Sequence, residues 1–130
     1  NIFSSAMKLN TQYMHIVHFN LKMKEPLTMT EVMEIFENNP LVAITEKKLS
    51  SQVFSFGRDH GHYGRILNQM VISIPSLQLI DGGKELVGFC FTPQDGNSLL
   101  SSISAATWFM YPNSYEQKIQ SLSDWFFDEV

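Results

Sequence analysis

Apolar and polar side chains alternate along residues 14–23, and this period of two predicts a half-buried strand. One predicted face carries His15, Val17, Phe19, Leu21 and Met23, and the other carries Met14, Ile16, His18, Asn20 and Lys22. Pro26 follows closely and has no N–H to donate, so the strand must end before it.

A helix is predicted next, over residues 28–38. Thr28 is placed to cap it, and Glu31 stands three residues on, where it completes a capping box. Leu27 and Val32 flank the cap as a hydrophobic staple. The apolar stripe of this helix is formed by Val32, Met33, Ile35 and Phe36. Asn38, Asn39 and Pro40 then end the helix, and the apolar run 41–45 predicts a buried strand that completes a β-α-β unit.

The later part of the chain predicts more strands, followed by helices. Residues 50–58 suit a strand or a short helix, and we favour the helix; residues 58–65 (RDHGHYGR) predict a loop. Strands are expected at 70–74 and 77–80, and the turn Asp81-Gly82-Gly83 leads to an antiparallel return at 86–91. Helices are expected at 99–110 and 114–128. The expected helix at 99–110 has an apolar face of Leu99, Ile103, Ala106 and Met110.

This order of elements predicts an α+β fold, with a mixed, largely antiparallel sheet and helices packed on one face. We treat residues 1–130 as one domain, because 130 residues can bury a single core. The helices should cover the face of Val17, Phe19 and Leu21. The face of Ile16 and His18 then has no helix left to cover it, so we expect self-association through that face, as a two-fold dimer.

The amino-acid composition limits the kinds of binding partner that we expect. The chain is 44% hydrophobic and 17% charged, its net charge is -4, and it has no run of Lys or Arg. We therefore expect no nucleic-acid partner and no membrane partner. A single cysteine, Cys90, excludes an internal disulfide and fits a reducing, cytoplasmic compartment. The chain opens on Asn1 with no initiator Met and no signal-peptide pattern, so we expect it to be part of a longer protein.

Few residues suggest chemistry when read without a family. His15 is partly desolvated at the edge of an apolar face, which suits a general base, although a structural histidine is the more common outcome. His18 points to the opposite face, so the pair cannot chelate one metal. We expect a solvated loop around His60 and His62, no metal site, and a buried, inert thiol at Cys90.

A polar loop follows the strand at 86–91. Its side chains Gln94, Asp95 and Asn97 precede a predicted helix. Loops at strand ends often hold ligand-binding groups, but simple turn and cap chemistry explains the same residues equally simply. The sequence pattern alone leaves both interpretations open.

Four segments in order carry a resemblance to a known family. They read TQYMHIVHFNLKMKEPLTMTEVMEIFENNPLV, LSSQVFSFGRDHG, PQDGN and SISAATWFM. The series resembles the catalytic C-terminal domain of type II, archaeal-type glyceraldehyde-3-phosphate dehydrogenases. The resemblance implies that His15 is the catalytic base. It places Thr11 on the first Thr of the family's Thr-Thr-Leu-Met-His segment and Lys8 near a phosphate-binding position. It also implies that Gln94, Asp95 and Asn97 lie near the nicotinamide of the cofactor.

The resemblance also implies components that this chain lacks. The family's nucleophilic cysteine and Gly-rich domain precede the matching stretch, and Cys90 does not match the nucleophile. The cofactor, NAD or NADP, would be bound mainly by the protein's own N-terminal dinucleotide-binding domain. A glycolytic role, a homo-oligomer (dimer or tetramer) and an inactive isolated fragment are also implied.

This chain departs from the family pattern at three places. Gln12 replaces the second Thr, Val17 replaces a histidine, and His60-Gly61-His62 replaces Leu-Gly-Arg. These changes motivate an alternative hypothesis, that the chain is a dehydrogenase-derived oligomerisation or ligand-binding module without catalysis.

Overall fold

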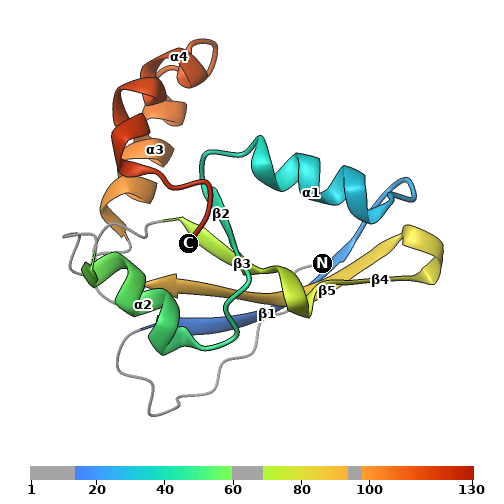
Figure 1. Cartoon of the computed structure of the whole chain (residues 1–130). Coiled ribbons are helices and arrows are strands. Elements are labelled where there is room, and N and C mark those ends of the chain that lie inside the picture. Colours follow the sequence, from blue (N-terminus) through green and yellow to red (C-terminus); the bar gives the residue numbers. More distant parts are fainter. Residues whose placement is uncertain (1–13, 60–68, 94–97) are drawn as a thin grey trace.

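The computed structural model describes residues 14–59, 69–93 and 98–130, and its centre is a five-stranded mixed sheet (Figure 1). The strands are β1 (Met14–Lys22), β2 (Val42–Thr45), β3 (Met70–Ser73), β4 (Gln78–Ile80) and β5 (Glu85–Pro93). Their order is β1-β5-β3-β2, and β4 pairs with β5. Strand β5 is antiparallel to β1, β3 and β4, whereas β2 and β3 are parallel. The predicted α+β class with a mixed, largely antiparallel sheet is confirmed.

The expected β-α-β unit is more open than the simplest form of that motif. Strands β1 and β2 run in the same direction, because each is connected through pairings that include the antiparallel β5. They nevertheless lie at opposite ends of the strand order, with β5 and β3 between them. The adjacent parallel pair is β2 and β3, and helix α2 (Ser50–Asp59) connects them. The short helix that we favoured at 50–58 is thereby confirmed.

The first helix, α1 (Met29–Glu37), begins at the capping box that the sequence predicts. The Glu31 N–H donates to Thr28 Oγ1 at 3.3 Å, and the Thr28 N–H donates to Glu31 Oε2 at 2.7 Å. The backbone hydrogen bond from Thr28, with a second from its hydroxyl, holds the pKa of the Glu31 carboxyl below its ordinary value. Asn38 ends the helix, and its N–H donates to the Glu34 carbonyl.

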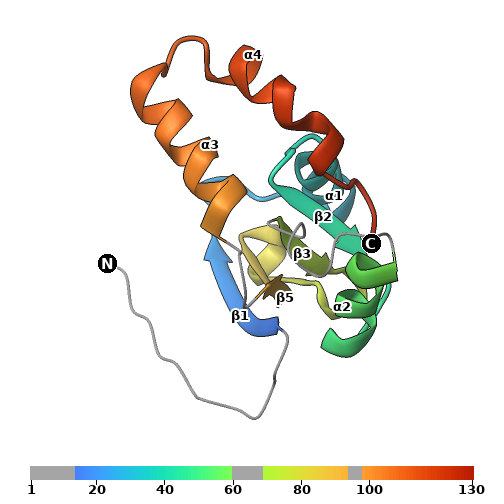
Figure 2. The same ribbon diagram turned by 90° about the vertical axis from the view of Figure 1, so that its left-hand side faces the viewer.

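The placement of the helices differs from our expectation that they pack on one face. Figures 1 and 2 show α1 and α2 on opposite sides of the sheet. Val53 of α2 is fully buried, and it packs on the face that carries Met14. The core cluster there comprises Met14, Ala43, Val53, Val71, Phe91 and Val130. The sequence of residues 50–58 indicates an apolar side of the helix, but it does not indicate which face of the sheet that side contacts. The prediction that all helices pack on one face was wrong for this reason.

The turn between β4 and β5 has the conformation that its sequence predicts. Asp81, Gly82 and Gly83 have φ values of 50°, 63° and 89°. These residues form η2 (Asp81–Gly83), while η1 (Ile74–Ser76) includes Pro75 and separates β3 from β4. The Gly83 carbonyl accepts a hydrogen bond from the Leu27 N–H at 2.9 Å, which ties this turn to the start of α1.

The C-terminal part forms an arm that consists of α3 (Ser98–Met110), α4 (Tyr115–Ile119) and η3 (Gln120–Trp125). Figure 2 shows α3 and α4 projecting from the sheet as a separate layer. Ile103 and Met110 are 40% and 68% exposed, so the expected apolar face of α3 does not pack into the core along its length. Within the described ranges, no helix is both long and apolar enough to cross a lipid bilayer.

The predicted helix at 114–128 is wrong in its second half. Helix α4 stops at Ile119, a 3₁₀ helix follows, and the chain is extended from Phe126 onward. Glu129 then forms a parallel bridge with Ile44 on the free edge of β2. Residues 128–130 form backbone hydrogen bonds with Ile44 at the edge of β2, and a continued helix could not form them.

Candidate functional site

His15 lies near the start of β1, opposite Thr92 of β5. Its neighbour Met14 is 1% exposed and belongs to the core cluster, whereas the His15 side chain is exposed. The alternation of side chains along a strand explains this contrast, since Met14 and His15 point to opposite faces. The buried methionine therefore anchors the backbone from which the imidazole reaches solvent.

The strand pairings bring several chain segments to the same end of the sheet, which we call the site end. Met14 pairs with Pro93, Val71 pairs with Phe91, and Val42 pairs with Met70. Strands β1, β2 and β3 therefore start where β5 finishes. Met14, Met70 and Pro93 lie at this end together with His15. Met14 follows segment 1–13, and Pro93 precedes segment 94–97.

Five of the six predicted site residues lie outside the described residues: Lys8, Thr11, Gln94, Asp95 and Asn97. The predicted loop histidines, His60 and His62, also lie outside them. Their chemical roles stay predictions. What the described residues do show is that Pro93, which precedes Gln94, is the direct partner of Met14, which precedes His15.

Cys90 shares a sheet face with His15, but it is only 1% exposed. Burial raises the pKa of its thiol to about 11, because a thiolate would lose its hydration there. A neutral, buried thiol is a poor nucleophile. The expectation of a buried cysteine is confirmed, and its inertness stays a prediction.

His18 lies on the opposite face of β1, and its ring packs against Phe89 with a centroid distance of 5.0 Å. The two histidines of β1 thus have different surroundings, and they cannot bind a common metal from this strand. Across the ranges 14–59, 69–93 and 98–130, no group of three His, Cys, Asp or Glu side chains is arranged to hold a metal ion.

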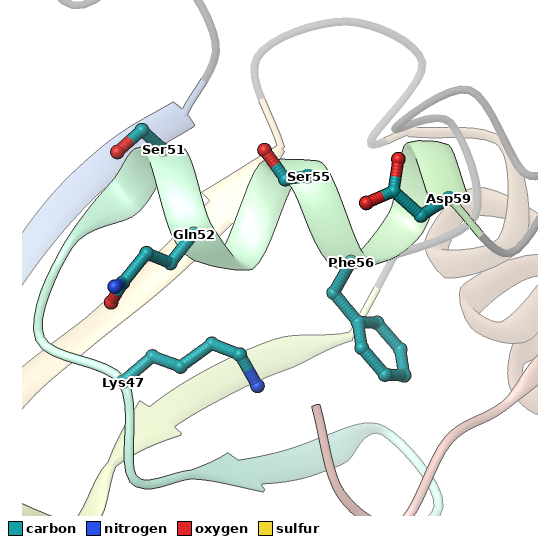
Figure 3. A pocket seen from close by; sticks show the side chains of 6 residues that line it. All are labelled: Lys47, Ser51, Gln52, Ser55, Phe56 and Asp59. Atoms are coloured by element: carbon teal, nitrogen blue, oxygen red, sulfur yellow. The ribbon is translucent and has the colours of Figure 1, made fainter.

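A cavity of about 400 Å³ lies along α2 (Figure 3). It is lined by Lys47, Ser51, Gln52, Ser55, Phe56 and Asp59. The Lys47 ammonium lies 5.3 Å from the centroid of the Phe56 ring, a favourable cation–π distance. His15 is not among the residues that line this cavity.

Dinucleotide phosphates are usually held by a Gly-rich turn between a strand and the N-terminus of a helix. The glycines among the described residues are placed otherwise: Gly57 is within α2, Gly82 and Gly83 form the β4–β5 turn, and Gly88 is within β5. A Cβ at Gly88 would come within 2.9 Å of the Phe19 ring, so this glycine serves strand packing. None of the described glycines therefore forms a Gly-rich turn of this kind.

Sequence reasoning missed one well-built polar site at Gln69, whose side chain is 1% exposed. Its amide nitrogen donates to the carbonyls of Pro40 at 3.0 Å and Phe127 at 2.8 Å, and its oxygen accepts from the Phe127 N–H at 2.7 Å. A single glutamine before an apolar strand gives no periodic signal, so no sequence pattern could have identified it.

Comparison with known proteins supports a relationship to glyceraldehyde-3-phosphate dehydrogenases. The chain is 36% identical to the enzymes of Pyrococcus furiosus and Pyrococcus woesei, and 35% identical to that of Pyrococcus abyssi, each over 63 residues. These matches cover 45% of this chain and 19% of each relative. No family model matches the chain. The similarity is to archaeal oxidoreductases, over a part of their length.

Proposed function

We propose that this chain is the catalytic or substrate domain of an NAD(P)-dependent phosphorylating aldehyde dehydrogenase that resembles glyceraldehyde-3-phosphate dehydrogenase. The observation that carries the proposal is the position of His15. It lies exposed on a rigid strand, at the site end, one strand position from the residue pair that borders segment 94–97. The partial similarity to archaeal glyceraldehyde-3-phosphate dehydrogenases supports the same reaction class.

The proposed role of His15 is that of a general base. A phosphorylating aldehyde dehydrogenase needs a thiolate that attacks the aldehyde, and an imidazole within hydrogen-bonding reach can accept the proton of that thiol. The thiol must come from chain outside these residues, because Cys90 is buried and protonated. When bound, the nicotinamide cofactor accepts the hydride.

The described residues explain how the base would be positioned. Nine consecutive residue pairs join β1 to β5, so the backbone at His15 is held on one side along the whole strand. Met14 fixes the same backbone from the core, and Thr92 lies directly across from His15. Such a framework holds a side chain more accurately than a loop can.

Several further features belong to this proposal. The cofactor is NAD or NADP, and an N-terminal dinucleotide-binding domain of the same protein holds most of it. The proposed protein works in glycolysis in the cytoplasm, and the 130-residue fragment alone is inactive. Lys8 and Thr11 contact the substrate phosphate, and Gln94, Asp95 and Asn97 lie near the nicotinamide.

The test compares two histidine variants of the full-length protein. His15→Ala should lower kcat for NAD(P)-dependent oxidation of glyceraldehyde-3-phosphate by about 10²–10⁴-fold, the usual contribution of a general base. His18→Ala is the matched control, since it removes an imidazole from the same strand but from the opposite face. Equal activity of His15→Ala and wild type, with a folded variant, would remove His15 from the mechanism.

One observation favours the alternative, a non-catalytic oligomerisation or ligand-binding module. Among the described residues, no side chain hydrogen bonds to the His15 ring, whereas catalytic histidines are usually oriented by such a partner. The full-length wild-type protein has both His15 and His18. If it binds NAD or NADP and yet oxidises no aldehyde, that result would replace the enzyme hypothesis with the hypothesis of a non-catalytic module.

Self-association through the sheet face that carries Ile16 and His18 also stays a prediction. Ile16 and Phe89 are 45% and 44% exposed on that face, although α2 covers the face at Met14. We expect the protein to form a two-fold dimer at micromolar concentration. Light scattering of the Ile16→Asp variant should then report a monomer, and an unchanged mass would exclude this interface.

A further inference from the structure

A cavity of about 620 Å³ lies between the second half of the arm and the C-terminal end of α1. We call it the arm cavity. Asn38, at the C-cap of α1, and Leu41, just before β2, line one side of it. Residues of α4 and η3, followed by Phe126, line the other side. Its volume falls within the range of about 300–1,000 Å³ that is usual for small-molecule sites.

Part of the lining of the arm cavity is apolar. Ile119 is buried, and Leu41 and Phe126 are half-buried. The Tyr115 side chain is also half-buried, and its hydroxyl lies 2.6 Å from Ser104 Oγ on α3, which restrains the ring. A ligand could therefore bury an apolar body against two aromatic and two aliphatic side chains.

The charges around the arm cavity are negative. Of the described residues that line it, only Glu116 is charged, and it is exposed. The C-terminal end of α1 contributes the negative end of a helix dipole, and its last turn has no basic residue. Asn38 Nδ2 donates to the Glu34 carbonyl at 2.8 Å, which leaves Asn38 Oδ1 as an unused acceptor among the described residues. These groups favour a cation and disfavour an anion.

The protein's own basic side chain on α4 lies elsewhere. Lys118 Nζ is 4.3 Å from the centroid of the Tyr111 ring, and Lys118 does not line the arm cavity. In the part of the chain that the structure describes, Glu116 forms no ion pair. The carboxylate of Glu116 is thus available to a cation from outside the chain.

We propose that the arm cavity binds a small organic cation, in which an alkylated ammonium group is attached to an apolar body. The ammonium would lie near the Glu116 carboxylate and the Tyr115 and Phe126 rings, because aromatic faces attract quaternary ammonium groups. The apolar body would displace water from Leu41 and Ile119. This ligand site does not depend on the proposed dehydrogenase function.

The charge requirement is tested with choline and its uncharged carbon isostere, in which a tert-butyl group replaces the trimethylammonium group. Saturation-transfer NMR on the full-length protein should report saturable choline binding with a Kd of about 1 mM or below. The isostere has the same shape and hydroxyl, so it should bind at least about tenfold more weakly if the cation is recognised. Equal affinities of the two compounds, or no saturable binding of choline at about 10 mM, would overturn the proposal.

Variants test whether binding occurs in the arm cavity. Glu116→Gln should weaken choline binding about fivefold or more, because it removes the charge and keeps the size of the side chain. Glu25→Gln is the matched control, since Glu25 is exposed and does not line the cavity, and it should bind choline as wild type does. The same affinity in both variants would overturn the assignment to this cavity.

The aromatic contribution is tested at Tyr115. Tyr115→Phe loses the hydroxyl near Ser104 but keeps the ring, so it should retain choline binding. Tyr115→Leu loses the ring and should weaken binding several-fold. Circular dichroism checks that both variants are folded. Equal choline affinity of folded Tyr115→Leu and Tyr115→Phe would contradict recognition by the ring.

Discussion

At one end of the sheet, β4 turns into β5; at the other, β1 and β3 begin and β5 finishes. The first, which we call the turn end, is closed by contacts among short, neighbouring segments. The Leu27 N–H donates to the Gly83 carbonyl, the Met23 N–H donates to the Lys84 carbonyl, and the capping box starts α1 beside them. At the site end, Met14 meets Pro93 and Val42 meets Met70.

The comparison shows that the candidate chemistry lies at the site end, whereas residues at both ends stabilise the fold. The turn end consists of turn and cap residues whose conformation depends on their immediate neighbours. The site end brings the exposed His15 close to Met14 and Pro93, and the core cluster lies on the opposite face of β1 from His15. We therefore expect substitutions at the turn end to lower stability without touching the reaction, and substitution of His15 to do the reverse.

The largest expected effect lies at Met14, beneath the site end. Met14→Ala should lower the free energy of unfolding by about 2–5 kcal/mol, because the side chain is 1% exposed within the core cluster. Ile16→Ala, on the same face but 45% exposed, should cost about 1 kcal/mol or less. Urea denaturation measures both. Equal costs would contradict the assignment of the core to the start of β1.

Gly83→Ala should have the next largest effect, at the turn end. A Cβ there would lie 2.5 Å from the Leu27 carbonyl oxygen, and φ is +89°, so we expect a loss of about 2–4 kcal/mol. Gly82→Ala, with a φ of +63° and open space around its Cβ, should lose only about 1–2 kcal/mol. Thermal melting separates them, and a Gly82→Ala loss as large as that of Gly83→Ala would contradict the close contact with Leu27.

The smallest effect is expected at the cap of α1. Thr28→Ala should lower the free energy of unfolding by about 1 kcal/mol, because the Glu31 N–H loses its side-chain acceptor.

Folding lowers the pKa of Glu31 below its ordinary value of 4.5. The stabilisation from this carboxylate is therefore present above pH 4.5 and is lost as the pH falls through the lower pKa of the folded state. The unfolding free energies of wild type and Glu31→Gln, measured by urea denaturation, should therefore converge in acid.

The turn end is also the part that sequence patterns predict best. The capping box at Thr28 and the turn at residues 81–83 depend on neighbouring residues, and both are present. The strand at β1 is present too, but its predicted half-buried alternation is wrong, because Val17 and Leu21 are 41% and 49% exposed. The cap and turn signals involve residues that are close together in the chain, so sequence patterns reveal them.

Long-range features could not be predicted in the same way. Three such features depend on residues far apart in the chain. They are the side of the sheet that α2 covers, the extended residues 126–130, and the hydrogen bonds between Gln69 and Phe127. For the site, the sequence pattern indicated His15 as a candidate, and the strand register placed it beside the border of segment 94–97. Assigning the base role needs the resemblance, because an exposed histidine on a strand has no periodic signature of catalysis.

The most direct test of the central claim is chemical rescue of the full-length His15→Ala variant. If His15 acts as a general base, added imidazole should restore NAD(P)-dependent aldehyde oxidation partly and saturably, by about tenfold or more above the rate of the variant, within the 10²–10⁴-fold that a base contributes. The His18→Ala variant should show no such response. A His15→Ala variant that is inactive, folded and unchanged by imidazole would show that His15 supports the structure and does not transfer the proton.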